Sequence, residues 1–414
     1  MVGGGGREHA LVRTLRRSPR EPEVLCAPGN AGIARDGIEC LPDRDIVGLA
    51  RAREIDLVVV GPEAPLVAGL VDELAEAGIR AFGPSRAAAR IEGSKAYAKA
   101  LMRDCGVPTA SHVLFRSREE GAEHLACASY PAVLKADVLA AGKGVIIAPD
   151  EREARAALDV FFAERRFGET EVVLEEFLEG EELSLLALCD GDRAVPLAPA
   201  QDYKRIFDGD EGPNTGGMGS YSPVPGVDAA RAREITAIAH QPIVDELRRR
   251  GTPFHGVLYA GLMMGPAGPK VLEYNCRFGD PETQAVLPRL RSDLLELLER
   301  SVVTGGLEGA EPEWASDWAV TVVLASRGYP ETSSRGDVIR GLDLVTDAEV
   351  FHAGTAERDG EVVTDGGRVL GVTGLGAGPG EARDRAYAAA DLIEFSGRRL
   401  RRDIAARAAD RVEA

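Results

Sequence analysis

The chain has 414 residues, with 49 Lys and Arg against 67 Asp and Glu, so its formal net charge is -18. Length predicts two to four domains, since domains usually run to about 100–200 residues. Hydrophobic residues make up 44% and charged residues 28% of the chain, a composition typical of a folded globular protein. The acidic balance argues against non-specific binding to nucleic acid or to an anionic membrane, because both need a basic surface.

Strand and helix patterns alternate through the first 90 or so residues. Residues 24–27 and 55–60 are predicted as buried strands, each followed by Gly or Pro. Residues 66–77 have apolar side chains at helical spacing and end at Gly78. This alternation predicts a parallel sheet with helices on its faces.

Two further blocks follow, one from about residue 85 to 303 and one over the last 110 residues or so. The predicted strands are 132–135, 145–148, 172–176, 183–189, 319–325 and 369–373. The predicted helices are 151–162, 228–249 and 381–393. Gly305, Gly306 and the acidic stretch 308–313 indicate a linker between the two blocks.

The location of the protein is predicted from its apolar runs and cysteines. The longest apolar runs, such as 57–60, are far shorter than the ~20 residues of a membrane span. No basic segment followed by an apolar run is visible near residue 1, so we expect no signal peptide. The six cysteines form no C-x-x-C pair, which favours free thiols in a reducing cytoplasm over a zinc site.

A glycine-rich turn, Gly3 to Gly6, leads into a helical pattern. Backbone N–H groups at such a turn bind phosphate well. The dinucleotide fingerprint G-x-G-x-x-G is not met, because Glu8 or His9 stands where its third glycine belongs, and this argues against a nicotinamide enzyme. From spacing alone, a ligand-binding turn and a plain strand-to-helix turn are equally good interpretations of the segment.

Two longer polar segments have the composition of phosphate or substrate loops. Residues 135–145 place Lys135 at the end of a strand and Lys143 in a loop of small residues, so that two ammonium groups and mobile amides can meet phosphate. This is not a Walker A loop, since Gly144 follows Lys143. Residues 202–219, with their amide and glycine content, are too specific for a tether and favour a functional loop.

The strongest chemical signal is the stretch 272–282. Alternate side chains of a strand lie on one face, so Glu273, Asn275 and Arg277 are expected to project together. Carboxylate and amide oxygens are the ligands that Mg²⁺ takes when it also holds nucleotide phosphates. An adjacent arginine can hold a phosphoryl group during its transfer.

With these motifs in order, the chain resembles the phosphoribosylamine–glycine ligases of the ATP-grasp superfamily over essentially its whole length. The matching strings are residues 5–11, 27–32, 60–66, 92–95, 135–145, 212–219, 258–263, 275–284 and 402–404. The resemblance implies an α/β fold with an N-terminal parallel α/β domain at 1–91 and an ATP-grasp core at 92–304. A mobile lid would span about 112–183, and a small α+β domain would occupy 305–414.

The resemblance also implies the reaction and the ligands. ATP would phosphorylate the glycine carboxylate, and the amine of 5-phosphoribosylamine would attack the resulting glycyl phosphate to give glycinamide ribonucleotide, ADP and phosphate. The partners are then small molecules, with neither nucleic acid nor membrane involved, and we expect a monomer.

The roles implied for individual residues fall into four groups. ATP would be bound by Lys95, Lys135, Ala141, Gly142, Lys143, Gly144, Glu175, Glu176, Leu178 and Glu182. Mg²⁺ or Mn²⁺ would be held by Glu273 and Asn275, and the catalytic residues would be Arg277, Lys204 and Asp202. The substrates would be bound by Gly4, Gly5, Gly6, Pro28, Gly29, Asn30, Asn214, Thr215, Gly216, Gly217 and Asp280.

The sequence departs from the family pattern at two places. Only Met1 and Val2 precede Gly3, where the family has a hydrophobic strand of about six residues, so we expect a loosened N-terminal sheet and a true start upstream. Val138 stands where the family usually has Gly, and a β-branched residue needs a negative φ, so we expect a stiffer or shifted lid turn. The alternatives are another ATP-grasp ligase or carboxylase, and a nucleotide-binding protein impaired in catalysis.

Overall fold

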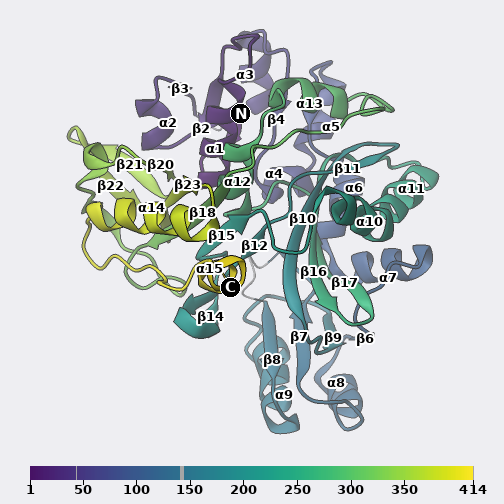
Figure 1. The fold of residues 1–414 in the computed structure, drawn as a ribbon. Helices are drawn as coiled ribbons and strands as arrows, with labels where there is room; N and C mark the ends of the chain where they lie inside the picture. The colour runs from purple at the N-terminus through teal and green to yellow at the C-terminus, as the bar shows by residue number, and fades with distance from the viewer. Residues whose placement is uncertain (43, 140–143, 414) are drawn as a thin grey trace.

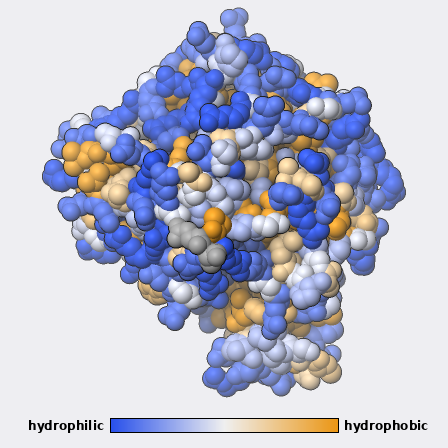
Figure 2. All heavy atoms as spheres, viewed as in Figure 1, coloured by the Kyte–Doolittle hydropathy of each residue, from blue (hydrophilic) through white to orange (hydrophobic). Residues whose placement is uncertain are grey.

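The computed structural model describes residues 1–42, 44–139 and 144–413. Figure 1 shows a central body, a sheet with helices that projects from it, a purple N-terminal part and a yellow C-terminal part. Within the described residues no helix is both long and apolar enough to cross a lipid bilayer. The face seen in Figure 2 is largely hydrophilic, as the high content of charged residues predicts.

The N-terminal part pairs its short strands in parallel, as the alternating pattern predicts. Its strands are β1 (Val2–Gly3), β2 (Leu25–Pro28), β3 (Glu39–Cys40), β4 (Val58–Val59) and β5 (Ala81–Phe82). Its helices are α1 (Gly6–Leu15), α2 (Ala31–Arg35), α3 (Ile46–Ala52), α4 (Glu63–Ala68), α5 (Leu70–Glu76) and α6 (Arg86–Gly93). The sheet order is β1-β2-β3, with β4 paired to β5.

Strand β1 is only two residues long, yet it is bonded on both sides. The N–H of Ala27 donates to the carbonyl of Met1 (2.9 Å), and the N–H of Gly61 donates to that of Val2 (3.0 Å). A parallel bridge also joins Val2 to Val60. The short strand therefore connects the two parallel pairs of this part of the fold.

The expected helix over 66–77 is wrong as a single element. Helix α4 ends and α5 begins on either side of Gly69, whose φ is +97°. This is a left-handed conformation that glycine adopts without a Cβ clash. The apolar spacing continues across Gly69, which is why the pattern alone predicts one helix.

The central body is an antiparallel sheet in the order β11-β10-β16-β17. Its strands are β10 (Glu181–Asp190), β11 (Ala194–Pro196), β16 (His255–Gly265) and β17 (Gly268–Asn275). Its helices are α7 (Lys95–Cys105), α10 (Ala229–Ala239), α11 (Gln241–Arg249), α12 (Glu282–Val286) and α13 (Leu294–Ser301), with a 3₁₀ turn η3 (Leu287–Arg289). Buried residues of α6, α7, α10 and α11 share one core with β10, β16 and β17.

The expected helix over 228–249 is also two helices, α10 and α11, joined at His240. Pro242 occupies the first turn of α11, where its missing N–H is tolerated. In the interior of one long helix the same proline would remove a hydrogen bond and clash with the preceding turn. The break is therefore caused by Pro242.

The projecting sheet has the order β6-β9-β7-β8 and its own core. Its strands are β6 (His112–Phe115), β7 (Ala132–Ala136), β8 (Val145–Ala148) and β9 (Val172–Glu176). Helices α8 (Arg118–Leu125) and α9 (Glu151–Leu158) accompany it, and a π-helical turn η1 (Asp159–Ala163) follows α9. Figure 1 shows this unit extending away from the rest of the molecule.

The C-terminal part is built on a five-stranded sheet in the order β12-β15-β18-β23-β20. Its strands are β12 (Gln201–Asp202), β15 (Gly219–Ser222), β18 (Trp318–Ala325), β20 (Glu349–His352) and β23 (Arg368–Gly376). The other elements are β13 (Arg205–Phe207), β14 (Glu211–Asn214), β19 (Arg335–Val338), β21 (Thr355–Arg358), β22 (Glu361–Asp365), α14 (Pro379–Leu392), α15 (Ala406–Glu413), η2 (Asp208–Asp210) and η4 (Leu342–Leu344). Strands β12 and β15 come from the middle of the chain, so residues 202–219 are anchored in this sheet.

Candidate active site

Strand β17 carries the predicted metal ligands as an alternating pair. Glu273 and Asn275 are both half-buried, and Tyr274 between them is buried. Their register partners on β16 are Gly261 and Tyr259. Because Glu273 and Asn275 are two residues apart on one strand, their side chains share a face, as the sequence predicts.

Arg277 follows the end of β17 and lies between two carboxylates from the N-terminal part. Its guanidinium is 3.2 Å from Glu63 on α4 and 3.2 Å from Glu92 on α6, and it donates to the amide oxygen of Asn275 (3.3 Å). Burial alone would lower the pKa of Arg277, but Glu92 and Glu63 raise it. The arginine is therefore held in place and stays charged.

Lys204 lies between Asp202 and Glu182. Its ammonium is 2.8 Å from Asp202 and 2.9 Å from Glu182. Burial opposes the charge of Lys204, yet Asp202 and Glu182 raise its pKa well above the ordinary value. Glu182, which is expected to bind ATP, thus has a half-exposed carboxylate that is paired with a lysine.

A buried carboxyl group that the sequence did not single out, Glu282, joins this cluster. Its oxygen accepts hydrogen bonds from Tyr259 (3.1 Å) and Ser184 (3.3 Å), and Ser184 also donates to Asp202 (3.4 Å). Burial and the neighbouring Asp202 raise the pKa of Glu282 to about 6. Glu282 therefore takes up a proton at a higher pH than an ordinary glutamate. Its place after the Gly-Asp-Pro turn was the only sequence signal.

Two of the lysines expected to bind ATP, Lys95 and Lys135, lie on different elements. Lys135 lies one residue before the end of β7 and donates to the carbonyl of Leu272 on β17 (3.1 Å), while Lys95 begins α7 and donates to the carbonyl of Val138 (3.1 Å). Burial would raise the pKa of Glu273, but Lys204, Lys135 and Lys95 together lower it. Three lysines from three segments therefore stabilise the charge of one carboxylate.

Behind Lys135 lies a buried ion-pair network. The carboxylate of Glu175 is 3.1 Å from Lys135 and 3.0 Å from Lys99, and all three side chains are less than a tenth exposed. Burial, opposed by Glu175, lowers the pKa of Lys99 to about 8. The side chain of Glu175 therefore supports Lys135. Lys99, four residues after Lys95, was not expected in the site, although this helical spacing signals a shared face.

Other residues expected around ATP are placed at the junction of β9 and β10. Glu176 is paired with Lys270 (3.0 Å) and accepts from the N–H of Ser111 (3.0 Å), and Leu178 is half-buried. Gly144 accepts from the N–H of Ala136 (2.9 Å) at the start of the return into β8. The expected lid residues Ala141, Gly142 and Lys143 lie outside the described residues.

The residues expected to receive phosphoribosylamine are brought together from two loops. Gly29 donates to the carbonyl of Gly3 (3.2 Å), and the amide of Asn30 donates to the carbonyl of Gly4 (2.9 Å). A Cβ at Gly4 would lie 2.2 Å from the carbonyl oxygen of Gly29, so this approach requires glycine. Pro28 ends β2, directly before Gly29.

Asp280 lies beside this glycine turn. A Cβ placed on Gly5 would be 3.5 Å from its carboxylate, and one on Gly6 would be 2.6 Å from Gln284, which donates to Asp280 (2.7 Å). Burial would raise the pKa of Asp280, but Arg368 lowers it. The carboxylate thus faces the turn in its charged form.

The loop 214–217 reaches the same region through Arg368, which the sequence did not single out. Arg368 begins β23, donates to the carbonyls of Gly216 and Asp280, and lies 3.4 Å from the Asp280 carboxylate. Thr215 donates from its N–H and its hydroxyl to the carbonyl of Lys204 (2.7 and 2.9 Å). Asn214 pairs in register with Arg205, and the N–H of Gly217 donates to the hydroxyl of Thr215 (3.0 Å).

The donor chemistry at β17 fits a divalent metal ion that also binds phosphate. Among the described residues there is no cluster of three or more His, Cys, Asp or Glu side chains that would enclose a metal by itself. Glu273 and Asn275 offer hard oxygen ligands, and the lysines beside them suit an anion. Two protein oxygens with phosphates completing the coordination match the way Mg²⁺ is usually held with nucleotides.

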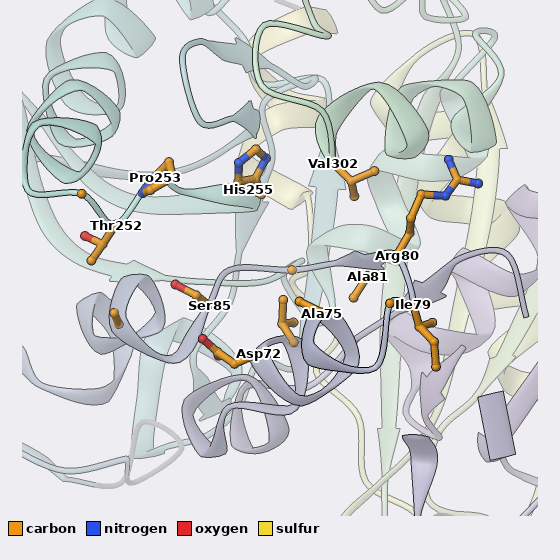
Figure 3. A pocket seen from close by; sticks show the side chains of 15 residues that line it. Asp72, Ala75, Ile79, Arg80, Ala81, Ser85, Thr252, Pro253, His255 and Val302 are labelled. Atoms are coloured by element: carbon orange, nitrogen blue, oxygen red, sulfur yellow. The ribbon is translucent and has the colours of Figure 1, made fainter. Parts of the chain in front are cut away.

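A cleft of about 640 Å³ lies elsewhere, between the N-terminal part and the central body. Figure 3 shows Asp72, Ser85, Thr252 and His255 on its wall. Two of these already have backbone partners, since Asp72 accepts from the N–H of Arg86 and His255 is 2.9 Å from the carbonyl of Ser301. None of the predicted site residues lines it, so the cleft is separate from the candidate active site.

Comparisons with known proteins agree with this geometry. Models of phosphoribosylglycinamide synthetase match three segments: the N domain at 1–92, the ATP-grasp (A) domain at 93–283 and the C domain at 319–407. The phosphoribosylamine–glycine ligase of Streptomyces coelicolor is 51% identical, covering 99% of both chains. That of Caldanaerobacter subterraneus is 46% identical, covering 98% of this chain and 99% of the relative.

Solved structures give the same result. The crystal structure of phosphoribosylamine–glycine ligase from Thermotoga maritima matches with a TM-score of 0.84 and 36% identity, covering 97% of this chain and 98% of that one. The biotin carboxylase domain of a Hydrogenobacter thermophilus 2-oxoglutarate carboxylase matches with a TM-score of 0.72 at 15% identity, covering 96% and 90%, which shows a shared fold alone. The chain therefore belongs to the phosphoribosylglycinamide synthetase family, whose curated members matched here are named phosphoribosylamine–glycine ligases.

Proposed function

We propose that this chain joins glycine to 5-phosphoribosylamine in an ATP-dependent reaction that gives glycinamide ribonucleotide, ADP and phosphate. The observation that carries the proposal is the face of β17, where the charges of Lys204, Lys135 and Lys95 lower the pKa of Glu273, two residues before Asn275. The family supports an ATP-dependent ligase of purine biosynthesis that uses a divalent metal ion. We assign Mg²⁺, with Mn²⁺ as a possible substitute, because oxygen ligands suit both.

In the first step a glycine carboxylate oxygen bonds to the γ-phosphorus of ATP, and the bond to the β-phosphate oxygen breaks, giving glycyl phosphate and ADP. Lys95 and Lys135 bind the phosphates of ATP, and Glu175 with Lys99 holds Lys135 in position. Arg277, fixed by Glu63 and Glu92, offsets the charge on the transferring group. The metal at Glu273 and Asn275 neutralises phosphate charge when bound.

In the second step the amine of phosphoribosylamine attacks the glycyl carbonyl, phosphate leaves, and the nitrogen loses a proton. Lys204, held by Asp202 and Glu182, is placed to neutralise the leaving phosphate. The turn Gly4–Gly6, the loop Pro28–Asn30, and Asp280 form the receiving site for the sugar phosphate. Such a reaction depends on positioning and charge neutralisation more than on a nucleophilic side chain.

The remaining assignments complete the proposal. Glu176 and Leu178 lie where the adenine would meet the β9–β10 junction, and Asn214 to Gly217 would close over glycine. We propose domains at 1–91, 92–304 and 305–414, with a lid over about 112–183. We also propose a monomer that works in the cytoplasm.

The test is ADP release with Mg-ATP, glycine and freshly made phosphoribosylamine. Release that requires both glycine and the amine supports the ligase. ADP release that needs bicarbonate instead points to a carboxylase of the same fold, and nucleotide binding without turnover points to a non-catalytic protein. A matched reaction lacking only glycine separates ligation from simple ATP hydrolysis.

A further inference from the structure

Among the buried arginines near the candidate active site, the one with the most hydrogen bonds is Arg401, in the C-terminal segment 401–403. Arg401 has no exposed surface and heads the set of the largest fully buried side chains. Its guanidinium donates to both carboxylate oxygens of Asp403 (2.8 and 2.6 Å), to Asp210 (2.9 Å) and to the carbonyl of Arg205 (3.0 Å). A buried charge is expensive unless it is paired and hydrogen-bonded, and these contacts use four of the five N–H groups of the guanidinium.

The partners of Arg401 flank a single catalytic residue. The carbonyl of Arg205 comes directly after Lys204, and the ring of Tyr203, directly before Lys204, lies 4.9 Å from the guanidinium carbon. Arg401 thus contacts the chain on both sides of Lys204. Burial would lower the pKa of this arginine, but Asp403 and Asp210 raise it, so it stays charged.

Neighbouring residues extend the same contact over the hairpin of β13 and β14. The N–H of Arg402 donates to Asp208 (2.7 Å), and the N–H of Gly209 donates to Asp403 (2.9 Å). On the near side, the N–H of Ala405 donates to the hydroxyl of Tyr203 (2.9 Å).

Hydrogen bonds connect residues 203 and 204, which lie beside Arg401, to the substrate loop 214–217. Thr215 donates twice to the carbonyl of Lys204, and the N–H of Met218 donates to the carbonyl of Tyr203 (2.7 Å). Lys204 and the loop 214–217 are therefore joined by hydrogen bonds, and Arg401 is the charged group that connects them to the C-terminal segment.

We infer that Arg401 is a positioning residue for Lys204, and that the C-terminal segment sets where the ammonium of Lys204 meets the reacting phosphate. The expected change in kcat rests on the proposed ligase function. The expected change in structure rests on the contacts alone. Misplacement of a catalytic group by about 1 Å can slow a reaction about 100-fold. Lys95 and Lys135 lie on other elements, so ATP binding should be spared.

The kinetic test compares Arg401→Met and Arg401→Lys with Arg402→Gln as the matched control. Arg402 precedes Asp403 in the same segment, but its side chain pairs with exposed Asp391 and does not contact the hairpin. We expect kcat to fall about 30- to 100-fold in Arg401→Met, and less in Arg401→Lys, which keeps the charge but not the fork of donors. KM for ATP should stay unchanged. A kcat equal to that of Arg402→Gln in both variants would overturn the inference.

If Arg401→Met fails to fold, Asp210→Asn serves as the second variant. Asp210 is half-exposed at the hairpin tip, and the change removes one ionic partner of Arg401 without disturbing a buried side chain. We expect kcat to fall about 3-fold, which corresponds to a barrier increase of about half of the 1.36 kcal/mol that makes a tenfold change. An unchanged kcat here counts against the inference.

Hydrogen exchange provides a readout that does not depend on the reaction. In Arg401→Lys the amides of Thr215 and Met218 should exchange about tenfold faster than in Arg402→Gln, because their acceptors on 203–204 are no longer held. Equal exchange in the two variants refutes the positioning role. Absence of glycine-dependent ADP release in the unaltered protein refutes the proposed function instead, so the two failures are distinguishable.

Discussion

Acid should destabilise the protein through His352, a buried histidine where β20 meets α1. His352 is 7% exposed, its ring lies 3.1 Å from the hydroxyl of Thr355, and its backbone N–H donates to the ring of His9 (2.8 Å). Burial, followed by the nearby His9 and Arg13, lowers the pKa of His352 to about 3. The folded protein therefore keeps this imidazole neutral at pH 5.

The size of the effect follows from the two pKa values. An unfolded histidine has a pKa of 6.5, above the folded value, so the contribution to stability is complete above pH 6.5 and is lost as the pH falls toward 3. At pH 5 the unfolded chain has taken up a proton that the folded chain excludes. Between pH 7 and pH 5 this difference removes about 2 kcal/mol from the free energy of unfolding.

The assay is denaturant unfolding at pH 7 and pH 5, followed by tryptophan fluorescence. The chain has two tryptophans, and Trp318 lies in the same sheet as His352. In His352→Gln the side chain cannot titrate while the backbone bonds remain, so this variant should lose about 2 kcal/mol less than the parent on acidification. If parent and variant lose the same free energy, the reasoning is wrong. By the same reasoning His240→Gln, in the central body, should also lose about 2 kcal/mol less than the parent, because burial lowers the pKa of His240 to about 4.

Three further predictions concern the site. Glu273→Gln and Asn275→Ala should each lower turnover, measured by ADP release, at least about 100-fold. Weak nucleotide binding, measured by titration of ATP, should remain. Normal turnover in either variant contradicts the metal assignment. Lys99→Met should lower the free energy of unfolding by roughly 3 kcal/mol, because it removes a buried partner of Glu175. An unchanged denaturation midpoint would contradict a stabilising role of this ion pair. Chelation of divalent ions should abolish turnover, and Mg²⁺ should restore it; activity that persists in excess chelator excludes a required metal.

Much of the fold could be predicted because local sequence patterns specify many of its strands and helices. The strands expected at 145–148 and 172–176 match β8 and β9, and the parallel pairing of the N-terminal strands followed from their alternation with helices. The misses occur where one residue interrupts a continuing pattern. Gly69 and Pro242 each divide a periodic segment into two helices, and apolar spacing does not record such a break.

The site was predictable where its residues lie close in sequence. The alternation of Glu273 and Asn275 on β17 needed only the period of a strand. The partners of Arg277 are Glu63 and Glu92, which lie more than 180 positions earlier in the chain. No local sequence pattern relates them to Arg277. Arg368 could not be predicted for the same reason. A single arginine in a strand looks like an ordinary surface residue, and only the fold brings this one to Asp280.

The loop that is proposed to receive phosphoribosylamine has a consequence for biosynthesis of the protein. The amide of Asn30 donates both to the carbonyl of Gly4 and to that of His352, which is 322 positions later in the chain (2.7 Å). Chains are synthesised at about 5–20 residues per second, so the second acceptor emerges roughly 16–64 s after Asn30. During that interval the side-chain amide of Asn30 lacks one of its two carbonyl acceptors. The pocket is therefore completed late on the ribosome, and a nascent chain should not turn over phosphoribosylamine before the C-terminal sheet has formed.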